Sequence, residues 1–157
     1  MKLLFPDVEF SEIRGNVDTR LRKIGEQHVA DGTILAAAGL KRLGIETWPG
    51  VEFAPLAFDH MVPAVGQGAI AVQCREPEAA KFGAVFDAAT ARAVNLERAF
   101  QAALGGGCHT AFAAHATVDK LHLFHESIGL QCVPISTADF AAPVETAARI
   151  LKDFGLI

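Results

Sequence analysis

The sequence predicts a mixed fold, in which an α/β segment is followed by a small α+β domain. Two observations support this prediction. Extended and helical patterns alternate over residues 8–44, and three short extended segments follow one another between residues 111 and 135, with helical patterns on both sides. The composition is that of a folded protein, because 51% of the 157 residues are hydrophobic and 20% are charged.

The first part of the chain contains two predicted strand–helix pairs. Short apolar runs predict the strands, while an asparagine before the first helix and a glycine after the second are favoured helix ends. Two strands do not form a stable sheet that is covered on both faces, so this part is expected to be the end of a larger α/β domain. The predicted elements are a strand at 8–13, a helix at 17–25 capped by Asn16, a strand at 33–37 and a helical turn at 39–43 before Gly44.

Prolines, aromatics and small residues dominate the stretch 46–59, which predicts a surface connection. Residues 63–72 follow it, with glycines at positions 66 and 68. These glycines indicate close backbone packing or a hinge, and the apolar run at 69–72 predicts a buried strand.

The last part of the chain predicts helices around a three-stranded meander. A helix opens at Pro77, and a longer one runs from Asp87, its predicted N-cap, to Leu104 with an apolar stripe along one side. Proline is favoured in the first turn of a helix, so the final helix is expected to start near Pro143. The residues of the apolar stripe are Ala93, Leu96, Phe100 and Leu104. The predicted strands are 111–118, 121–127 and 129–135. The final helix is expected to end before Gly155 and to bury Val144, Ala147, Ala148 and Leu151.

Cys108 follows three glycines in the turn between a helix and a strand. A thiol in such a turn is more exposed than a core thiol, and exposure with a shifted pKa makes a thiol reactive. The alternative is a helix C-cap followed by an inert small side chain. The chain has three cysteines without a CxxC motif, which favours a reducing compartment over a disulfide scaffold.

Three arginines are candidates for anion binding. Arg14 and Arg20 flank a predicted strand-to-helix junction, and Arg42 lies in the next helical turn. Arginine binds carboxylates and phosphates with two parallel hydrogen bonds, so these residues suit a ligand with several carboxylates. The alternative is a solvated helix face formed by Arg20, Arg22 and Lys23. The net charge of −4 gives no general attraction for nucleic acid, so any anion site must be local.

The remaining patterns argue against several classes of protein. Six histidines invite a metal hypothesis, but His122 and His125 are three apart in a predicted strand and face opposite sides, so no metal site is expected. The N-terminus is apolar too briefly for a signal peptide, and no apolar run approaches the length of a membrane span. A cytoplasmic protein without membrane or nucleic-acid partners is expected.

Four segments occur in a specific order along the chain. They are 13–21 (IRGNVDTRL), 34–44 (ILAAAGLKRLG), 63–69 (PAVGQGA), and 97–100 (ERAF) leading into 106–108 (GGC). In this order and spacing they closely resemble the porphobilinogen deaminase (hydroxymethylbilane synthase) family of tetrapyrrole biosynthesis. All four together make the resemblance specific, and it covers nearly the whole chain, most weakly at 46–58 and after 115.

The resemblance implies a chemistry and a set of site residues. The family joins porphobilinogen units head to tail, with loss of ammonia, on a dipyrromethane cofactor that a thioether attaches to a loop cysteine, which matches Cys108. Arginine stays cationic while it binds the acetate and propionate groups of the pyrroles. By resemblance, Cys108, Arg14, Arg20 and Gly107 bind the cofactor, and Arg42 and Gln67 bind the substrate.

The resemblance also implies a domain layout and a gap. Residues 1–60 match the end of a doubly wound, periplasmic-binding-protein-like α/β domain, 61–76 a crossover strand into the family's first domain, and 77–157 the α+β domain that carries the cofactor. The family's N-terminal half, with its catalytic aspartate, has no counterpart here, so no catalytic residue is assigned. Ala111 stands where the family usually has proline, which would make the loop less rigid, and Gln73 stands where the family commonly has glutamate.

Three functions remain open at this stage. The first is the C-terminal half of a hydroxymethylbilane synthase, which would act on porphobilinogen and polypyrrole intermediates with a separate N-terminal polypeptide. The second is a truncated, non-catalytic relic that binds pyrroles or associates with itself as a homo-oligomer through an exposed strand edge. The third is a plain binder of small anions that uses the arginines.

Overall fold

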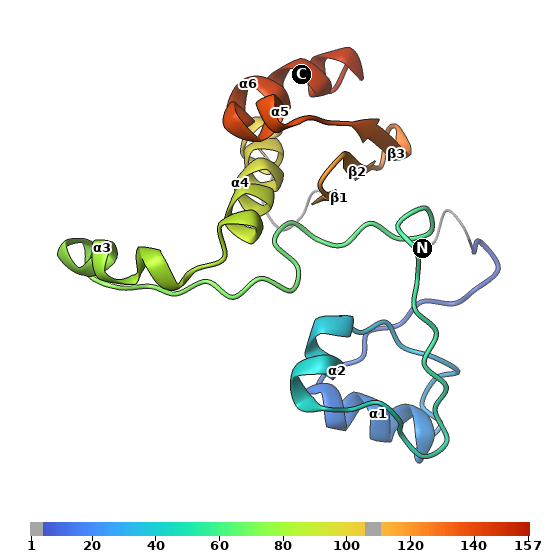
Figure 1. Cartoon of the computed structure of the whole chain (residues 1–157). Coiled ribbons are helices and arrows are strands. Elements are labelled where there is room, and N and C mark those ends of the chain that lie inside the picture. The colour runs from blue at the N-terminus through green and yellow to red at the C-terminus, as the bar shows by residue number, and fades with distance from the viewer. Residues whose placement is uncertain (1–4, 106–110) are drawn as a thin grey trace. The chain divides into compact units, whose positions relative to one another are not determined.

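The computed structural model describes residues 5–105 and 111–157 (Figure 1). Its internal contacts divide the chain into two compact units, Met1–Leu56 and Ala57–Ile157, which we describe separately. No helix in the described ranges is long and apolar enough to cross a membrane.

Unit 1 contains two helices, α1 (Val17–Gly25) and α2 (Ala37–Leu43). The side chain of Asn16 caps α1, because its Oδ1 accepts the Thr19 N–H at 2.9 Å. Gly44 ends α2 in the left-handed conformation, with φ of 66°. Both helices and both caps were predicted, and α2 starts two residues earlier than expected.

The strands predicted at 8–13 and 33–37 do not form: residues 8–13 and 33–36 are irregular, and Ala37 begins α2. A strand exists only when a neighbouring backbone pairs with it. In the described part of unit 1, the only pairing is an isolated bridge between Trp48 and Val51. Apolar side chains that a sheet would bury, Val8 and Ile34 among them, are instead exposed. The strand predictions are therefore wrong for this chain.

The stretch predicted as a surface connection lies against the end of α1. A Cβ atom on Gly25 would come within 2.5 Å of the Pro49 carbonyl oxygen, and one on Gly50 within 2.8 Å of the Gly25 carbonyl oxygen. Gly50 also has φ of 72°, which disfavours other residues. The two glycines thus let two backbone segments touch where any side chain would separate them.

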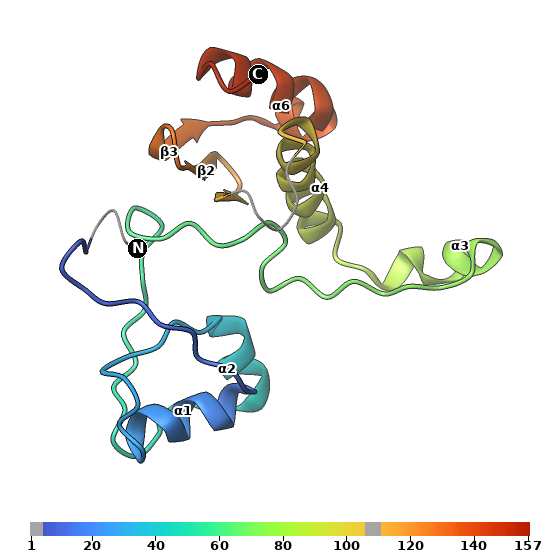
Figure 2. The ribbon, with the colours of Figure 1, turned by 180° about the vertical axis from the view of Figure 1, so that it is seen from behind.

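Unit 2 is built on a three-stranded antiparallel sheet in the order β1-β2-β3, as predicted (Figures 1 and 2). The strands are shorter than expected, and the helix predicted from Pro77 is interrupted by 3₁₀ turns. The elements are η1 (Glu76–Glu78), α3 (Ala79–Phe82), η2 (Gly83–Val85), α4 (Ala88–Ala103), β1 (Phe112–Ala116), β2 (Lys120–His125), β3 (Gly129–Pro134), α5 (Thr137–Ala141) and α6 (Pro143–Asp153).

The core of unit 2 lies between the sheet and the helices α4 and α6. Leu96 and Phe100 of α4 are fully buried, which confirms the predicted apolar stripe. On α6 the predicted face is half right: Ala147 and Leu151 are buried as predicted, whereas Val144 and Ala148 are exposed. The buried stripe runs in steps of three and four residues from Ala147 through Ile150 and Leu151 to Phe154.

The short helix α5 was not predicted, and it begins with a capping box. Ser136 and Asp139 each accept a hydrogen bond from the other's backbone or side chain, with the Ser136 N–H at 2.8 Å from Asp139 Oδ2. The other carboxylate oxygen accepts from Arg149 Nη2 at 2.7 Å and from the Thr146 hydroxyl at 3.2 Å. These hydrogen bonds, that of the Ser136 backbone first, lower the pKa of Asp139, although burial opposes them.

We expect Asp139→Ala to lower the free energy of unfolding by about 1–2 kcal/mol at neutral pH, because it removes a cap and a link between α5 and α6. A carboxyl group with a lowered pKa stabilises the fold above its usual value of 3.8, and this stabilisation is lost as the pH falls through the lower, folded value. Urea denaturation at neutral and acidic pH measures both effects. Asp153→Ala, at an exposed carboxylate at the end of α6, is the control; an equal loss in both variants would contradict the expectation.

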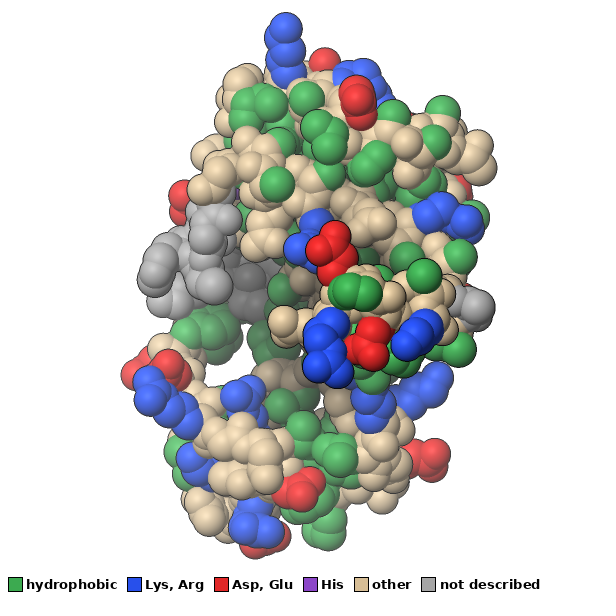
Figure 3. All heavy atoms as spheres, turned by 90° about the vertical axis from the view of Figure 1, so that its left-hand side faces the viewer, with side chains coloured by type: hydrophobic (Ala, Val, Ile, Leu, Met, Phe, Trp, Pro, Cys, Tyr) green, Lys and Arg blue, Asp and Glu red, His purple; other side chains and the backbone are tan. Residues whose placement is uncertain are grey.

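The prediction of a buried strand at 69–72 is wrong. The segment is irregular, and its apolar side chains are exposed, with Ile70 at 70% and Val72 at 55%. Phe82, Val85 and Phe86 beyond it are also exposed. Figure 3 views the side from which α3 projects and shows hydrophobic side chains between acidic and basic ones. No described segment pairs with residues 69–75, which explains why they form no strand.

Candidate functional site

The predicted arginine site in unit 1 is a turn at Gly15 that side chains of α1 hold in place. Gly15 has φ of +129°, and a Cβ atom there would come within 2.7 Å of the Thr19 side chain, so only glycine fits. Arg20 Nε donates to the Gly15 carbonyl at 2.9 Å, and Lys23 Nζ donates to the Arg14 carbonyl at 2.9 Å. The turn therefore brings three cationic residues together at the start of a helix.

The three predicted arginines differ in their surroundings. Arg14 is exposed and forms an ion pair with Glu12 at 2.9 Å, which contributes little to stability in water. Arg20 uses one of its five N–H donors on the turn. Arg42 is exposed in the last turn of α2. The structure thus brings Arg14 and Arg20 to one turn, while Arg42 lies on the second helix of the same unit.

The alternative that Arg20, Arg22 and Lys23 form one solvated helix face holds for only one of these residues. Arg22 forms an exposed pair with Glu26 one helical turn away, at 3.9 Å, as that alternative expects. Arg20 and Lys23 instead fold back onto backbone carbonyls of the turn. Their positions are therefore fixed by hydrogen bonds, which is what a preorganised anion site requires.

Gln67 lies in unit 2 at the tip of a double turn. Its N–H donates to the Ala64 carbonyl at 2.9 Å, and the Ala69 N–H donates to the Gly66 carbonyl at 3.1 Å. Gly66 and Gly68 have φ of 69° and 87°, a conformation that other residues rarely adopt. The glycines that predicted close packing or a hinge thus shape the turn Gly66–Gly68, which presents Gln67 to solvent.

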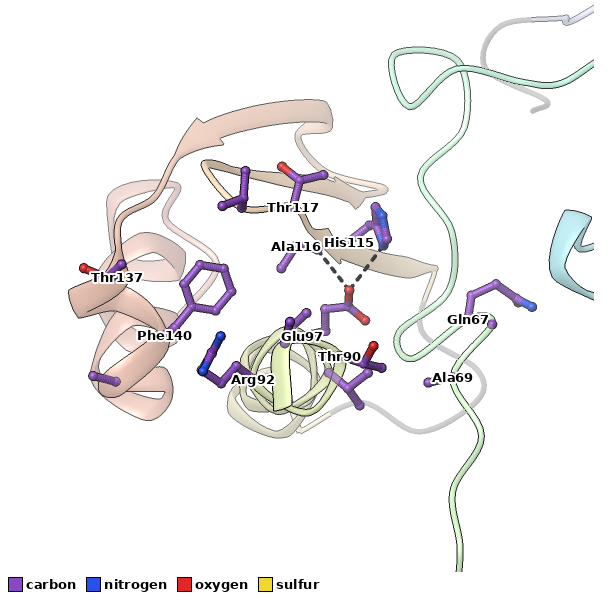
Figure 4. Close-up of a pocket in the computed structure, with 16 residues that line it drawn as sticks. Gln67, Ala69, Thr90, Arg92, Glu97, His115, Ala116, Thr117, Thr137 and Phe140 are labelled. Atoms are coloured by element: carbon purple, nitrogen blue, oxygen red, sulfur yellow. Dashed lines mark hydrogen bonds and ion pairs between the residues drawn. The ribbon is translucent and has the colours of Figure 1, made fainter. Parts of the chain in front are cut away.

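Glu97 of α4 is the most deeply buried acidic residue among the described ones, with 3% of its surface exposed. Its Oε2 accepts the Gly66 N–H at 2.7 Å, and its Oε1 accepts the Ala116 N–H at 2.9 Å. His115 Nδ1 lies 3.2 Å from Oε1 (Figure 4). One carboxylate therefore joins the double turn, α4 and the edge strand β1.

A pocket of about 880 Å³ opens beside Glu97 (Figure 4). Its walls are the turn at Gln67–Ala69, the first half of α4, the end of β1 and helix α5. Most of the lining is apolar, and its polar groups are a few hydroxyls, an amide, an imidazole, one carboxylate and one guanidinium, which suits a small ligand with an apolar body. Its polar and aromatic lining residues include Gln67, Thr90, Arg92, Thr117, Thr137 and Phe140.

Two imidazoles and a phenyl ring form a cluster on the sheet face opposite the core. His115 and His122 are direct cross-strand partners on β1 and β2. The Phe58 ring lies over both, with centroid distances of 4.6 Å and 4.9 Å. Burial lowers the pKa of His122, the positive charges of His115 and Lys120 lower it further, and Asp119 and Asp59 oppose this.

We expect the free energy of unfolding to fall as the pH drops below about 6.5, the usual histidine value, because the unfolded chain then binds a proton at His122 more readily than the folded one. His122→Gln should reduce this dependence, and urea denaturation at several pH values between 5 and 8, the range in which histidine titrates, would measure it. His28→Gln, at an exposed histidine in unit 1, should leave it unchanged. Identical pH profiles for wild type and His122→Gln would refute the assignment.

The histidines do not gather in a metal site within the described ranges, where no three His, Cys, Asp or Glu side chains are arranged to hold an ion. His122 and His125 lie three residues apart on strand β2. His125 accepts the Ser127 N–H at 3.2 Å through Nδ1. His115 and His122 belong to the ring cluster described above.

Cys108 and Gly107 lie outside the described residues, so their predicted roles stay predictions. The structure does place the elements on either side, since α4 ends at Ala103 and β1 begins at Phe112. The two cysteines that are described, Cys74 and Cys132, are exposed free thiols. They serve below as controls for Cys108.

Sequence reasoning assigned no role to Glu97 or His115. Yet Glu97 falls on the apolar stripe of its helix, four residues after Ala93 and three before Phe100. An acid on the buried face of an amphipathic helix is rare unless its charge is compensated, so this position was a readable signal. Nothing in the sequence indicated which N–H groups would compensate it.

Comparisons with known proteins place these features in a family context. The family model described as "Porphobilinogen deaminase, dipyromethane cofactor binding domain" matches residues 1–82. The porphobilinogen deaminase of Syntrophotalea carbinolica is 47% identical over 116 residues, which cover 72% of this chain and 36% of that protein. Those of Clostridium perfringens strain SM101 and Paenibacillus macerans are 42% and 43% identical, covering 79% and 73% of this chain and 42% and 35% of theirs. The chain thus spans well under half the length of these curated relatives.

Proposed function

The chain belongs to the porphobilinogen deaminase family, and from this premise we propose that it is the C-terminal half of a hydroxymethylbilane synthase. The match of residues 1–82 to a cofactor-binding domain is the observation that carries the proposal. The role in tetrapyrrole biosynthesis follows from the family. Activity on porphobilinogen is proposed to require a separate N-terminal polypeptide that supplies the catalytic aspartate.

In this proposal the dipyrromethane cofactor is attached to Cys108 through a thioether. When bound, the cofactor supplies the pyrrole end to which porphobilinogen units are added. Arg14, Arg20 and the Gly107 backbone would bind the cofactor, and Arg42 and Gln67 would bind the incoming substrate. The basic turn at Gly15 supports the role of Arg20, because an arginine held in position binds pyrrole carboxylates at low entropic cost.

We propose that the separate N-terminal polypeptide supplies strands that pair with unit 1 and with residues 69–72, and so completes an α/β sheet there. Residues 1–60 would end a doubly wound domain, 61–76 would cross into the partner's domain, and 77–157 would carry the cofactor. The exposed side chains of Val8, Ile34 and Ile70, each in a segment predicted as a strand, support this layout. The reducing environment suggested by the cysteine pattern favours the cytoplasm as the site of assembly.

One observation favours a second candidate function. Ile70 and Val72 are exposed in an apolar segment that no described strand covers. Such a segment also pairs readily with its own copy, which would give a non-catalytic, self-associating module that binds pyrroles. Size-exclusion chromatography coupled to light scattering distinguishes the two functions. A stable homo-oligomer that does not bind the N-terminal polypeptide favours the second function.

The proposal is tested by co-expressing the chain with an N-terminal half polypeptide and assaying the conversion of porphobilinogen to hydroxymethylbilane. We expect ammonia release and product from the pair, and neither from either half alone. The control is the same pair with Lys152→Gln, an exposed cation in the last turn of α6 outside the proposed roles, which should stay active. A pair that associates but forms no pyrrole adduct would refute the catalytic proposal and leave the binding module.

A further inference from the structure

Glu97 is bound in a way that sets it apart from the other acidic residues described. Its carboxylate is buried and accepts two backbone N–H groups that are distant in sequence, those of Gly66 and Ala116. The imidazole of His115 lies beside the oxygen that faces β1, at 3.2 Å. The half-buried Glu78 of this unit instead forms ion pairs with the exposed side chains of Arg75 and Lys81.

The chemistry of the site calls for a carboxylate and not merely a polar side chain. Each oxygen of Glu97 accepts from a different N–H, so both ends of the group act as acceptors. A glutamine of the same size would direct its NH₂ group at one of the two N–H donors. Burying a charge is costly unless hydrogen bonds and a partner offset it, and the two amides with His115 supply these.

The carboxylate of Glu97 joins the two elements that precede and follow Cys108 in the sequence, α4 and β1. Glu97 lies seven residues before Leu104, the C-cap of α4, a rise of about 10 Å along the helix. Ala116 ends β1, the strand whose first residue, Phe112, follows that segment. Gly66 begins the turn that presents Gln67. One side chain therefore joins both elements that flank the Cys108 segment to the turn that carries the predicted substrate residue.

We propose that Glu97 is a positioning residue, which holds the Gly66–Gly68 turn on α4 and β1 and so sets the place of Gln67 relative to these two elements. This inference rests on the proposed function for its consequence, the binding of a pyrrole substrate. Glu97 acts through the turn and does not itself contact pyrrole. His115 supports it by lying against the carboxylate from the sheet side.

The first test measures hydrogen exchange of single amides in the whole chain. In Glu97→Gln we expect the Gly66 and Ala116 amides to exchange roughly tenfold faster, while core amides such as Leu123 keep their protection. Glu126→Gln, the same change at an exposed carboxylate, should alter neither. If Glu97→Gln does not fold, Glu97→Asp provides the second measurement: its carboxylate is one methylene shorter and cannot reach both N–H groups, so at least one of the two amides should exchange faster. Unchanged exchange at both amides in a folded variant would overturn the proposal.

The second test uses the active pair of polypeptides. Glu97→Gln should raise the KM for porphobilinogen roughly tenfold with a smaller change in kcat, and Gln67→Ala should do the same. The double variant should be no worse than either single one, because both act through one turn. Additive effects would overturn the positioning role. An inactive wild-type pair would instead count against the proposed function, and the exchange measurement would still decide whether Glu97 holds the turn.

Discussion

Intact-mass spectrometry is expected to find a covalent dipyrromethane on the wild-type chain after incubation with porphobilinogen and the N-terminal polypeptide, and none on Cys108→Ser. The effect is all or none, because a thioether requires the cysteine sulfur and a serine hydroxyl is a far weaker nucleophile. The adduct also gives a direct readout of the proposed function that does not depend on turnover. Peptide mapping then assigns the modified residue.

The chain provides two matched controls for this experiment. Cys74 and Cys132 are exposed free thiols, so a reagent that modifies accessible cysteines would also label them. Cys74→Ser and Cys132→Ser should therefore keep the adduct in full. An adduct that survives in Cys108→Ser, or that maps to either of the other two cysteines, would show that the thioether assignment is wrong.

Phe100→Ala should lower the free energy of unfolding of unit 2 by about 3–5 kcal/mol, the range for removing a buried aromatic side chain and leaving a cavity. Phe100 is fully buried in the cluster that joins α4 to the sheet and α6. Small domains are stable by about 5–15 kcal/mol, so this single change removes a large share of the total. Urea denaturation followed by circular dichroism measures it.

The comparison variant is Val118→Ala, since Val118 is 86% exposed. It should shift stability by no more than about 0.5 kcal/mol, as surface changes do. Equal losses for the two variants would mean that the packing of α4 on the sheet contributes little, contrary to the core described above. Phe100→Leu, which keeps most of the volume, should fall between them.

The helices of this chain could be predicted because their signals are local. Asn16 and Asp87 each cap a helix through a hydrogen bond to the N–H three residues later, and the sequence identified both. The apolar stripe around Phe100 likewise repeats within one helix. The meander was equally accessible, because its three strands are neighbours in sequence and pair through short turns.

The remaining predictions failed where structure depends on distant partners. The segments 8–13, 33–37 and 69–72 have the composition of strands, but a strand forms only against another backbone, and the described residues offer them none. The short helix α5 was missed because five residues give too little periodicity to detect.

The arrangement of the candidate site residues could be predicted only in part, for the same reason, and their roles stay predictions. The basic turn at Gly15 is local, so the sequence located Arg14 and Arg20 together. The bonds of Glu97 join residues 19 and 31 positions away, and no local pattern encodes such pairs. What the sequence did contain was an acid on an apolar helix face, a signal that identifies a buried charge without identifying its partners.

The meander of unit 2 has a kinetic consequence. Its strands are linked by connections of three residues, Thr117–Asp119 and Glu126–Ile128, so every contact within the sheet spans a short stretch of chain. Proteins dominated by such local contacts fold fastest, because little loop entropy is lost before contacts form. This unit is therefore expected to fold soon after it is synthesised, before any strand from another polypeptide reaches unit 1. In the proposed assembly, the pairing of unit 1 with the other polypeptide would then come after the folding of unit 2 and would be the slower step.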